Sequence, residues 1–311
     1  MGKYAYGVDI GGTSVKIGMF DREGGKEDFW ELRTRTEDHG VNILPDVAAS
    51  IEKRMEEKEL KKSDIIGIGI GVPGPVDSKG TVLQAVNLGW GAFNVKATVE
   101  DLTGIRCEAG NDANVAALGE MWKGGGRGFD DMVLVTLGTG IGGGIISGGR
   151  LLVGASGAGG EIGHMHLEDD EPVQCNCGCF GCFEEYASAT GAVRVATRVL
   201  EATEQESVLR GREFTCKDIF DAAAGGDAVA QQAVEKYGYY LGKGLAIIAS
   251  VVNPEIFVLG GGVTKAGDTL LQLLKPSFEK YVFPGAGDCK FALATLGNDA
   301  GMYGAARLVL Q

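Results

Sequence analysis

The sequence predicts an α/β protein with two lobes, and two observations lead to this fold class. Segments that read as strands and as helices follow one another along all 311 residues, a length that suits two domains or two large lobes. A strand, a glycine turn and a second strand occur twice, at Val8–Gly18 and at Val135–Ile145. Two lobes that each begin in this way would face one another across a central cleft between their glycine hairpins.

The first half of the chain opens with alternating apolar residues, which are typical of strands, and continues with helices. In the first long helix, Ile51, Met55 and Leu60 form one apolar stripe among charged residues. In chain order we expect strands at Tyr4–Ile10, Ser14–Phe20 and Asp28–Arg35, a helix at Ile43–Lys62, a strand at Ile65–Gly71, a helix at Val95–Leu102, a strand at Ile105–Ala109 and a helix at Ala113–Lys123.

A glycine-rich segment, Gly124–Gly128, indicates a boundary, because the pattern restarts after it. We expect a smaller N-terminal lobe at residues 1–118, with a C-terminal helix at 299–311 packed on it, and a larger lobe at residues 119–298. Beyond the boundary we expect a strand at Met132–Leu137, a glycine turn at Gly138–Gly144, a strand at Ile145–Leu151, helices at Ala187–Thr203, Lys217–Ala224 and Ala228–Val251, a strand at Ile256–Leu259, a helix at Ala266–Tyr281, a strand at Phe291–Leu296 and a helix at Ala300–Val309.

Composition and charge narrow the classes of function. An apolar fraction of 44% is that of a globular protein with a sizeable core. The net charge of −13 argues against a nucleic-acid partner, because a polyanion is bound by a basic face. The longest apolar run, Leu245–Val252, is too short to span a bilayer, and no secretory signal opens the chain. We expect a cytoplasmic protein with small-molecule ligands, no nucleic acid and no membrane.

A histidine and four clustered cysteines predict a structural zinc site. Three thiolates and one imidazole complete a tetrahedron and leave no open position, which is typical of a structural metal. Five candidate ligands compete for four places, and we choose His164, Cys175, Cys177 and Cys182, with Cys179 spare. Disulfides or a redox C-x-x-C pair at Cys179 and Cys182 are the less favoured interpretation, because the chain has seven cysteines and no βαβ context surrounds the pair.

Two acids flank this cluster, Glu161 before it and Glu184 after it. They exceed the number of ligands that zinc needs. A metal that ties two loops together would hold these acids at a fixed separation, as a polar binding site requires.

Glycine-rich turns predict phosphate binding by backbone N–H groups. Two segments match G-x-G-x-x-G, at Gly69–Gly74 and Gly138–Gly143, but neither opens a helix, so a dinucleotide site is disfavoured. Hairpins whose N–H groups form an anion nest are the remaining explanation, with plain glycine hairpins as the alternative. The residues concerned are Gly11, Gly12, Thr13, Gly138, Thr139, Gly140, Gly260, Gly261 and Gly262.

Carboxylates near these turns are candidates for chemistry. Asp9 ends the first strand, where a nucleotide-bound Mg²⁺ would need a direct or water-mediated ligand. Asn111 and Asp112 lie between a strand and a helix. They are either helix-capping residues or a hydroxyl-binding amide next to a general base, and the residues alone leave both interpretations open.

Taken together, these motifs resemble the ROK family of sugar kinases over essentially the whole chain. The segments that carry the resemblance are Asp9–Thr13, Gly110–Asp112, Leu137–Gly144, Glu161–His164 and Cys175–Glu184.

The resemblance implies the actin-like ATPase fold, with ribonuclease-H-like halves around a cleft, and transfer of phosphate from MgATP to a hexose. It implies that Asp112 is the base and that His164 also binds zinc. It further implies that the sugar is bound by Asn111, Asp112, Glu161, His164 and Glu184. The larger lobe would then carry the zinc site and the nucleotide-binding loops.

Other segments resemble the bacterial glucokinases within the family, which implies the 6-hydroxyl of D-glucose as the acceptor. They are Gly71–Asp77, Asn87–Trp90, Glu185–Gly191, Gly260–Asp268 and Leu296–Gly301. The chain departs from the family pattern in the spacing from His164 to Cys175, which is one residue longer, and in having a cysteine at position 179. A kinase for another hexose, such as N-acetylmannosamine, N-acetylglucosamine or fructose, and a non-catalytic sugar sensor are the alternatives. We expect a homo-oligomer, either a dimer or a tetramer.

Overall fold

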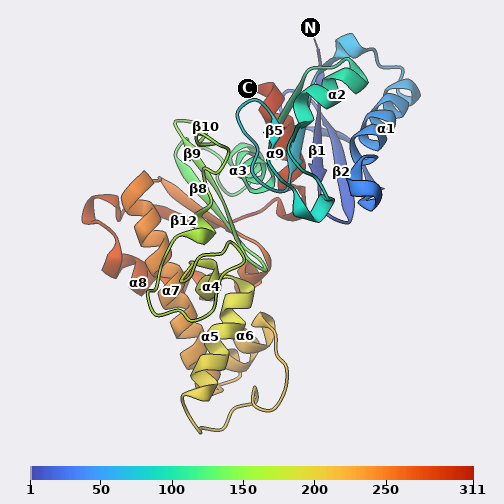
Figure 1. Ribbon diagram of the computed structural model, residues 1–311. Coiled ribbons are helices and arrows are strands. Elements are labelled where there is room, and N and C mark those ends of the chain that lie inside the picture. Colours follow the sequence, from blue (N-terminus) through green and yellow to red (C-terminus); the bar gives the residue numbers. More distant parts are fainter. Residues whose placement is uncertain (1) are drawn as a thin grey trace. The chain divides into compact units, whose positions relative to one another are not determined.

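The computed structural model describes residues 2–311, and by internal contacts the chain divides into two units (Figure 1). The first unit contains the chain up to Asp130, the segment Gly144–Gly160 and the segment Thr295–Gln311. The second unit contains Asp131–Gly143 and Glu161–Ala294. The contact-based units and the expected lobes both place residues 299–311 with the N-terminal part. The first unit also contains residues 119–130, 144–160 and 295–298, which the sequence placed in the larger lobe, and the domain ranges themselves stay a prediction.

The first unit is built on a five-stranded sheet in the order β3-β2-β1-β4-β7. Strand β1 pairs antiparallel with β2 and parallel with β4, β2 pairs antiparallel with β3, and β4 pairs parallel with β7. The strands are β1 (Tyr4–Ile10), β2 (Ser14–Phe20), β3 (Lys26–Arg33), β4 (Ile65–Val72) and β7 (Cys107–Asn111), and a separate two-stranded sheet joins β5 (Thr81–Val82) to β6 (Phe93–Asn94).

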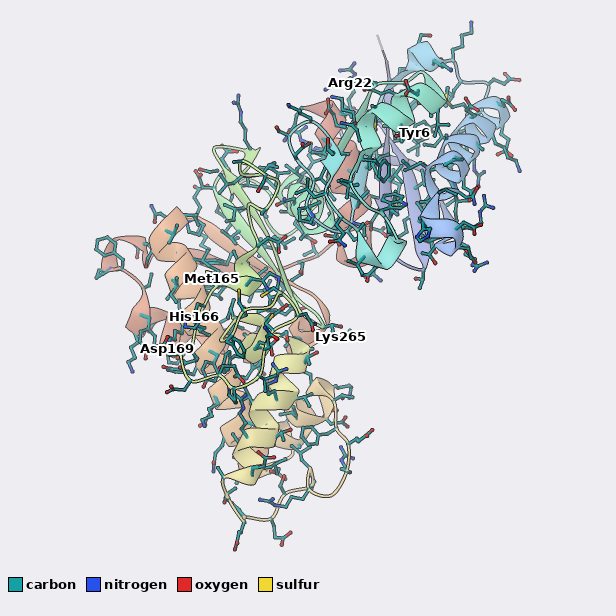
Figure 2. The ribbon with its side chains drawn as sticks, in the orientation of Figure 1. Tyr6, Arg22, Met165, His166, Asp169 and Lys265 are labelled. Carbon is teal, nitrogen blue, oxygen red and sulfur yellow. The ribbon has the colours of Figure 1, made fainter. Side chains whose placement is uncertain are left out.

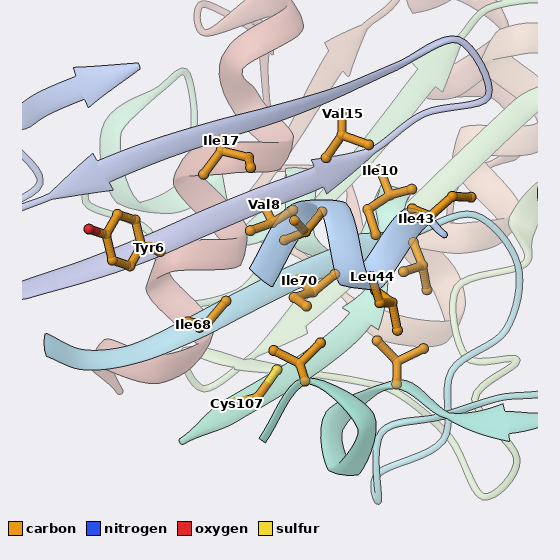
Figure 3. Packing of buried hydrophobic residues seen from close by; sticks show 14 of the residues in the cluster. Tyr6, Val8, Ile10, Val15, Ile17, Ile43, Leu44, Ile68, Ile70 and Cys107 are labelled. Carbon is orange, nitrogen blue, oxygen red and sulfur yellow. The ribbon is translucent and has the colours of Figure 1, made fainter. Parts of the chain in front are cut away.

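One face of this sheet forms the core of the first unit. Alternate residues of β1, namely Tyr6, Val8 and Ile10, are at most 1% exposed and point to the same face, as the two-residue period of a strand requires. Figure 3 shows them packed with apolar residues of β4 and with Ile43 and Leu44 of the first helix. Two amphipathic helices, α1 (Ile43–Glu57) and α2 (Val95–Thr103), contribute to this core.

The opposite face of the sheet is covered by α9 (Ala300–Leu310), which also packs against α3 (Asp112–Lys123). Glycines allow this close approach. A Cβ atom at Gly7 would lie 2.0 Å from the carbonyl oxygen of Met302, and one at Gly69 would lie 1.7 Å from that of Ala305. The helix backbone therefore rests directly on the strands, and an alanine at either position would force the two apart.

Helix α3 carries a buried carboxylate that links the loop following the helix to a distant segment of the chain. Glu120 is 1% exposed. Its Oε2 accepts hydrogen bonds from the N–H groups of Gly125 (2.7 Å) and Thr295 (3.1 Å), and its Oε1 accepts one from Leu296 (2.9 Å). These backbone donors satisfy a side chain that could not otherwise stay buried.

The second sheet has the order β10-β9-β8-β11-β12, which repeats the arrangement of the first sheet. In both, a hairpin at the start supplies the central strand, and two later strands add in parallel on its other side. The strands are β8 (Met132–Leu137), β9 (Ile141–Ser147), β10 (Arg150–Leu151), β11 (Ile256–Gly260) and β12 (Lys290–Leu293).

The second glycine turn is shorter than the sequence suggested, and this part of the prediction was wrong. We expected a turn at Gly138–Gly144, but β9 already begins at Ile141. The strand contains a glycine at position 144 because a Cβ there would lie 2.5 Å from the Cβ of Ala117 in α3. The strand expected at Ile145–Leu151 is instead the end of β9 and the short β10, separated by a turn at Gly148 and Gly149, both of which have positive φ.

The helices of the second unit are α4 (Glu184–Ala187), α5 (Ala189–Glu201), α6 (Cys216–Ala224), α7 (Ala228–Val252) and α8 (Asp268–Tyr281). The helix expected at Ala187–Thr203 is thus two helices. They are separated by Ser188, whose backbone is extended and whose Oγ accepts the N–H of Gly191 (2.9 Å) to cap α5. Other expected boundaries moved by a few residues, at α1, β3, β7, α8 and β12. Within residues 2–311, no helix combines the length and the apolar character that crossing a bilayer requires.

Candidate functional site

Asp112 is the first residue of α3, and its carboxylate is oriented by neighbours. Asp112 Oδ1 accepts hydrogen bonds from Asn111 Nδ2 (2.9 Å) and from the N–H of Ala113 (2.8 Å). The carbonyl side of the Asn111 amide caps the helix by accepting the N–H of Asn114 (3.1 Å), and Nδ2 also donates to the carbonyl oxygen of Gly74 (3.0 Å). Of the two interpretations of this pair, capping therefore applies to Asn111, and the same side chain positions the acid beside it.

Asp9, the penultimate residue of β1, is close enough to Asp112 for the charge of Asp112 to raise its pKa. Burial, and then the negative charge of Asp112, raise the pKa of Asp9 to about 6, while Lys16 acts in the opposite direction. The Asp9 carboxylate packs against Gly301 at the start of α9, where a Cβ would lie 2.5 Å from its Oδ2. Two acids in such surroundings favour a cation as a ligand, because a cation stabilises both ionised forms.

The first glycine turn, Gly11–Thr13, belongs to the same unit as Asp9. The N–H of Gly11 donates to the carbonyl oxygen of Ser14 (3.0 Å), which closes the hairpin between β1 and β2. Thr34 of the neighbouring segment fixes the turn from outside, since its Oγ1 donates to the carbonyl oxygen of Gly11 (2.7 Å).

The structure brings the other two glycine segments together in the second unit. A Cβ at Gly261 would lie 2.4 Å from the carbonyl oxygen of Leu137, so the loop Gly260–Gly262 packs against the start of the turn Gly138–Gly140. The N–H of Ala189, the first residue of α5, donates to the carbonyl oxygen of Gly138 (2.8 Å). Two of the three predicted phosphate-binding segments thus lie side by side.

A pocket of about 390 Å³ adjoins the loop Gly260–Gly262. It has one apolar aromatic wall, Phe220 of α6, and two lysines at its edge, one of which, Lys265, is labelled in Figure 2. This combination suits a flat heterocycle attached to phosphates. Its lining includes Thr215, Cys216, Lys217, Phe220, Gly262 and Lys265.

The histidine and cysteines chosen from the sequence form one cluster. The ligand atoms of His164, Cys175, Cys177 and Cys182 all lie within 4.8 Å of one another. In a tetrahedral site with zinc–sulfur bonds of about 2.3 Å, two sulfurs lie about 3.8 Å apart. The Sγ atoms of Cys177 and Cys182 are 3.6 Å apart, and Cys175 Sγ is 3.8 Å from His164 Nδ1. The four residues therefore fit a zinc ion, and all seven cysteines are free thiols.

Cys179 is exposed and does not belong to this group of four. Its backbone contributes instead, since the N–H of Cys175 donates to the carbonyl oxygen of Cys179 (2.8 Å). His166 contacts two other parts of the same loop. Its Nδ1 is 2.9 Å from the carbonyl oxygen of Phe180, and its Nε2 is 2.8 Å from Oδ1 of Asp169. Figure 2 labels both His166 and Asp169.

Both flanking acids approach His164. Glu161 Oε2 is 3.9 Å from Nε2 of His164, and Glu184 Oε1 is 3.4 Å from its Nδ1. The ring thus presents Nδ1 to the thiols and Nε2 to Glu161, as a residue with two roles requires. Glu184 also connects the cluster to the glycine turn, because the Cys175 thiol donates to its Oε1 (3.1 Å) and the N–H of Ile141 donates to its Oε2 (3.2 Å).

Sequence reasoning missed the pocket residues Lys217, Phe220 and Lys265. The sequence contains one indication of this region, the capping box formed by Thr215 and Asp218, which predicts that a helix begins at Cys216. Nothing in the sequence indicates that this helix start lies next to a glycine loop some 45 residues later in the chain, because that contact depends on how the helices pack.

Comparison with known proteins identifies relatives over the full length. The ROK family model matches residues 5–311. A glucokinase of Halalkalibacterium halodurans is 45% identical over 315 residues, which cover 99% of this chain and 96% of the relative.

Two solved structures are similar over nearly the whole chain. The crystal structure of a ROK family glucokinase from Streptomyces griseus, in complex with glucose and AMPPNP, is 36% identical, covers 98% of both chains and has a TM-score of 0.75. The ROK hexokinase of Thermus thermophilus is 31% identical over 97% of this chain and 96% of its own, with a TM-score of 0.82. The family match, the full-length similarity and the two repeated sheets together establish that this chain belongs to the ROK family and has the actin-like ATPase fold of that family.

Proposed function

We propose that this protein is a glucokinase, which transfers the terminal phosphoryl group of ATP to the 6-hydroxyl of D-glucose. The observation that carries the proposal is the orientation of Asp112. Its Oδ1 is held by the Asn111 amide and by the N–H of Ala113 at the start of α3. A carboxylate fixed in this way is suited to accept a proton from a substrate hydroxyl.

In the proposed reaction, Asp112 takes the proton of the glucose 6-hydroxyl as that oxygen attacks the γ-phosphorus. A bond forms between O6 and phosphorus, the bond from phosphorus to the β,γ-bridging oxygen breaks, and ADP leaves with the electron pair. Positioning and charge stabilisation supply most of the rate in such a transfer, because the transition state asks for little covalent chemistry.

The nucleotide would be held by the glycine segments and their threonines. The backbone N–H groups of Gly11–Thr13, Gly138–Gly140 and Gly260–Gly262 are suited to phosphate oxygens, and Thr13 and Thr139 add hydroxyl donors. The Mg²⁺ that accompanies ATP would interact with Asp9. The raised pKa of Asp9 supports this role, since a bound cation would return the carboxylate to its ionised form.

The sugar would be bound by Asn111, Glu161, His164 and Glu184. In support of this, the two acids lie on either side of the His164 ring. When bound, zinc would be a structural ion that ties the loop of Cys175 and Cys177 to Cys182 and His164. The N–H of Ile141, which donates to Oε2 of Glu184, would keep that acid in place beside the phosphate-binding turn.

The choice of glucose is supported by the relatives. The Halalkalibacterium halodurans and Streptomyces griseus proteins are glucokinases, and the second was crystallised with glucose and AMPPNP. A site that pairs its acids with sugar hydroxyls rejects analogues that lack them, because buried polar groups would then be left unpaired.

A coupled assay of ADP release over a panel of sugars tests this proposal. We expect kcat/KM for glucose to exceed that for mannose and glucosamine by about tenfold or more. As a matched control, 6-deoxyglucose retains the other hydroxyls and should bind without being phosphorylated. More efficient phosphorylation of N-acetylmannosamine, N-acetylglucosamine or fructose would refute glucose as the preferred acceptor and leave the family assignment intact.

A further inference from the structure

The loop that leads from His164 to Glu184 contains a buried carboxylate outside the metal cluster. Glu171 is 5% exposed as a residue, and its side chain is fully buried. It is the last of four consecutive acids, Glu168–Glu171, so the sequence gives no sign that this one is buried while Asp169 stays exposed. A buried carboxylate is costly unless it is paired, and its partners therefore indicate what it does.

Both oxygens of Glu171 accept strong hydrogen bonds. Oε1 accepts from Nη2 of Arg198 in α5 (2.6 Å) and from the N–H of Val173 (3.0 Å), and Oε2 accepts from the hydroxyl of Tyr186 (2.5 Å). Burial by itself raises the pKa of Glu171, but these three donors outweigh it and lower the pKa to about 2. The carboxylate is thus ionised and anchored on three sides.

Tyr186 connects this anchor to the helix that carries Glu184. Helix α4 has four residues, Glu184–Ala187, and a helix of one turn has little stability of its own. Its position is set by side-chain contacts. The Tyr186 ring packs against Tyr240 of α7, with the ring planes tilted by 37° and the centroids 4.5 Å apart, and the Arg198 guanidinium lies 5.8 Å from the Tyr186 ring centroid.

We propose that Glu171 is a positioning residue for the sugar site. Through the Tyr186 hydroxyl it fixes α4, and thereby the Glu184 carboxylate, by contacts that do not involve the four metal ligands. The loop is therefore held at two separate places, by the cysteine and histidine cluster and by the Glu171 carboxylate with its partners Arg198 and Tyr186. This inference deepens the proposed function and rests on it, because it assigns Glu184 a sugar-binding role.

The test compares Glu171→Ala, Glu171→Gln and Tyr186→Phe with the wild type. We expect Glu171→Ala to raise KM for glucose about tenfold, with little change in KM for ATP, because a displaced binding group weakens one substrate selectively. Glu171→Gln keeps the shape and can still accept from Arg198 and Val173, so it should recover most of the loss. Tyr186→Phe removes only the hydroxyl link and should raise KM for glucose about threefold.

Two further measurements separate positioning from a general loss of structure. Zinc content by elemental analysis should stay at the wild-type value in all three variants, and hydrogen exchange of the amides in residues 184–187 should become faster. The matched control is Glu168→Ala on the same loop, where the acid is partly exposed and pairs with Lys243 (2.8 Å). It should leave KM for glucose and exchange in α4 unchanged.

The inference is overturned if Tyr186→Phe, together with any Glu171 variant that folds, leaves both glucose KM and exchange in α4 at wild-type values. It is also overturned if Glu171→Ala loses zinc, since Glu171 would then support the cluster as a whole. Failure of the proposed function gives a different result: the wild type itself would not phosphorylate glucose, and hydrogen exchange in α4 would still report on Glu171.

Discussion

The two glycine hairpins occupy the same place in two sheets of the same topology, but their surroundings differ. The first, between β1 and β2, follows a strand whose penultimate residue is Asp9, and the pKa of Asp9 is raised by burial and by Asp112. The second, between β8 and β9, is followed by Ile141, whose N–H donates to Glu184. A carboxylate is therefore close to each turn. Asp9 is in an environment that disfavours its ionised form, whereas Glu184 is held by hydrogen bonds.

The difference indicates how one structural element can serve two purposes. An acid that remains hard to ionise is ready to interact with a cation, so the first hairpin is suited to the metal of a nucleotide. An acid that accepts a backbone donor is fixed in space, so Glu184 beside the second hairpin is suited to recognising a neutral ligand, while the N–H groups of the turn itself are suited to phosphate. In the proposed function these are the Mg²⁺ and the sugar.

The largest effect is expected at Asp112, the acid at the start of α3 whose charge contributes to raising the pKa of Asp9. Asp112→Asn removes the proton acceptor and keeps the size of the side chain, so kcat should fall by about 10²–10⁴-fold, the usual contribution of a positioned base. Steady-state kinetics should show the loss in kcat, and calorimetry should show glucose binding within a few-fold of wild type.

The control for this variant is Asp268→Asn. Asp268 is also the first residue of a helix, α8, and is exposed, so it tests loss of a helix-terminal charge without loss of the base. Near-normal turnover by Asp112→Asn would reduce Asp112 to a helix-terminal residue and would contradict its role as the base.

The next effect concerns the cluster behind the second hairpin. Cys177→Ala should reduce metal content below one zinc per chain and raise KM for glucose about 10–100-fold, because the loop that leads to Glu184 loses its metal tie. Elemental analysis and kinetics on the same preparation check both parts. Cys179→Ala is the matched control and should retain the metal. Loss of zinc in Cys179→Ala together with its retention in Cys182→Ala would contradict the chosen ligand set.

A third effect, on folding stability rather than on activity, is expected at Asp9. The pKa of Asp9 is about 6 in the folded protein and 3.8 as an ordinary aspartate, so the folded state binds more protons between these values. Stability therefore rises as the pH falls from 6 towards 4, and at pH 8 the ionised carboxylate costs on the order of 3 kcal/mol. Asp9→Asn should be more stable than wild type at pH 8 by up to this amount, and the difference should shrink below pH 6.

Urea unfolding at pH 8, 6 and 4.5 measures this difference. The exposed Asp101→Asn on α2 serves as a control and should show no such trend. A destabilised Asp9→Asn at pH 8 would mean that the first hairpin needs its negative charge for folding, and the contrast between the two hairpins would disappear.

Much of this arrangement follows from local sequence patterns. The strand–turn–strand repeats at Val8–Gly18 and Val135–Ile145 predicted two lobes that each begin with a glycine hairpin, because apolar alternation and glycine turns are encoded by neighbouring residues. The spacing of Cys175, Cys177 and Cys182 predicted their clustering with His164 for the same reason. The ROK resemblance supplied the fold, and the family match confirmed it.

What the sequence did not predict depends on packing between distant segments. Gly144 was assigned to a turn because nothing local shows that a helix backbone passes beside it. Glu120 and Glu171 look like ordinary surface acids, yet each is buried by donors from elsewhere, in the case of Glu120 from residues 295 and 296. Such partners can be identified only once the chain is folded.

The packing of α9 on the first sheet has a consequence for how the chain is made. The face of β1 and β4 at Gly7 and Gly69 is covered by α9, which consists of residues 300–310. The packing of these first strands can therefore be completed only after some of the last residues have been synthesised. The second unit needs residues no later than Ala294. During synthesis, the second unit can therefore complete its contacts first, and the N-terminal strands keep one apolar face exposed until α9 has been made, which prolongs the time in which that face can form non-native contacts.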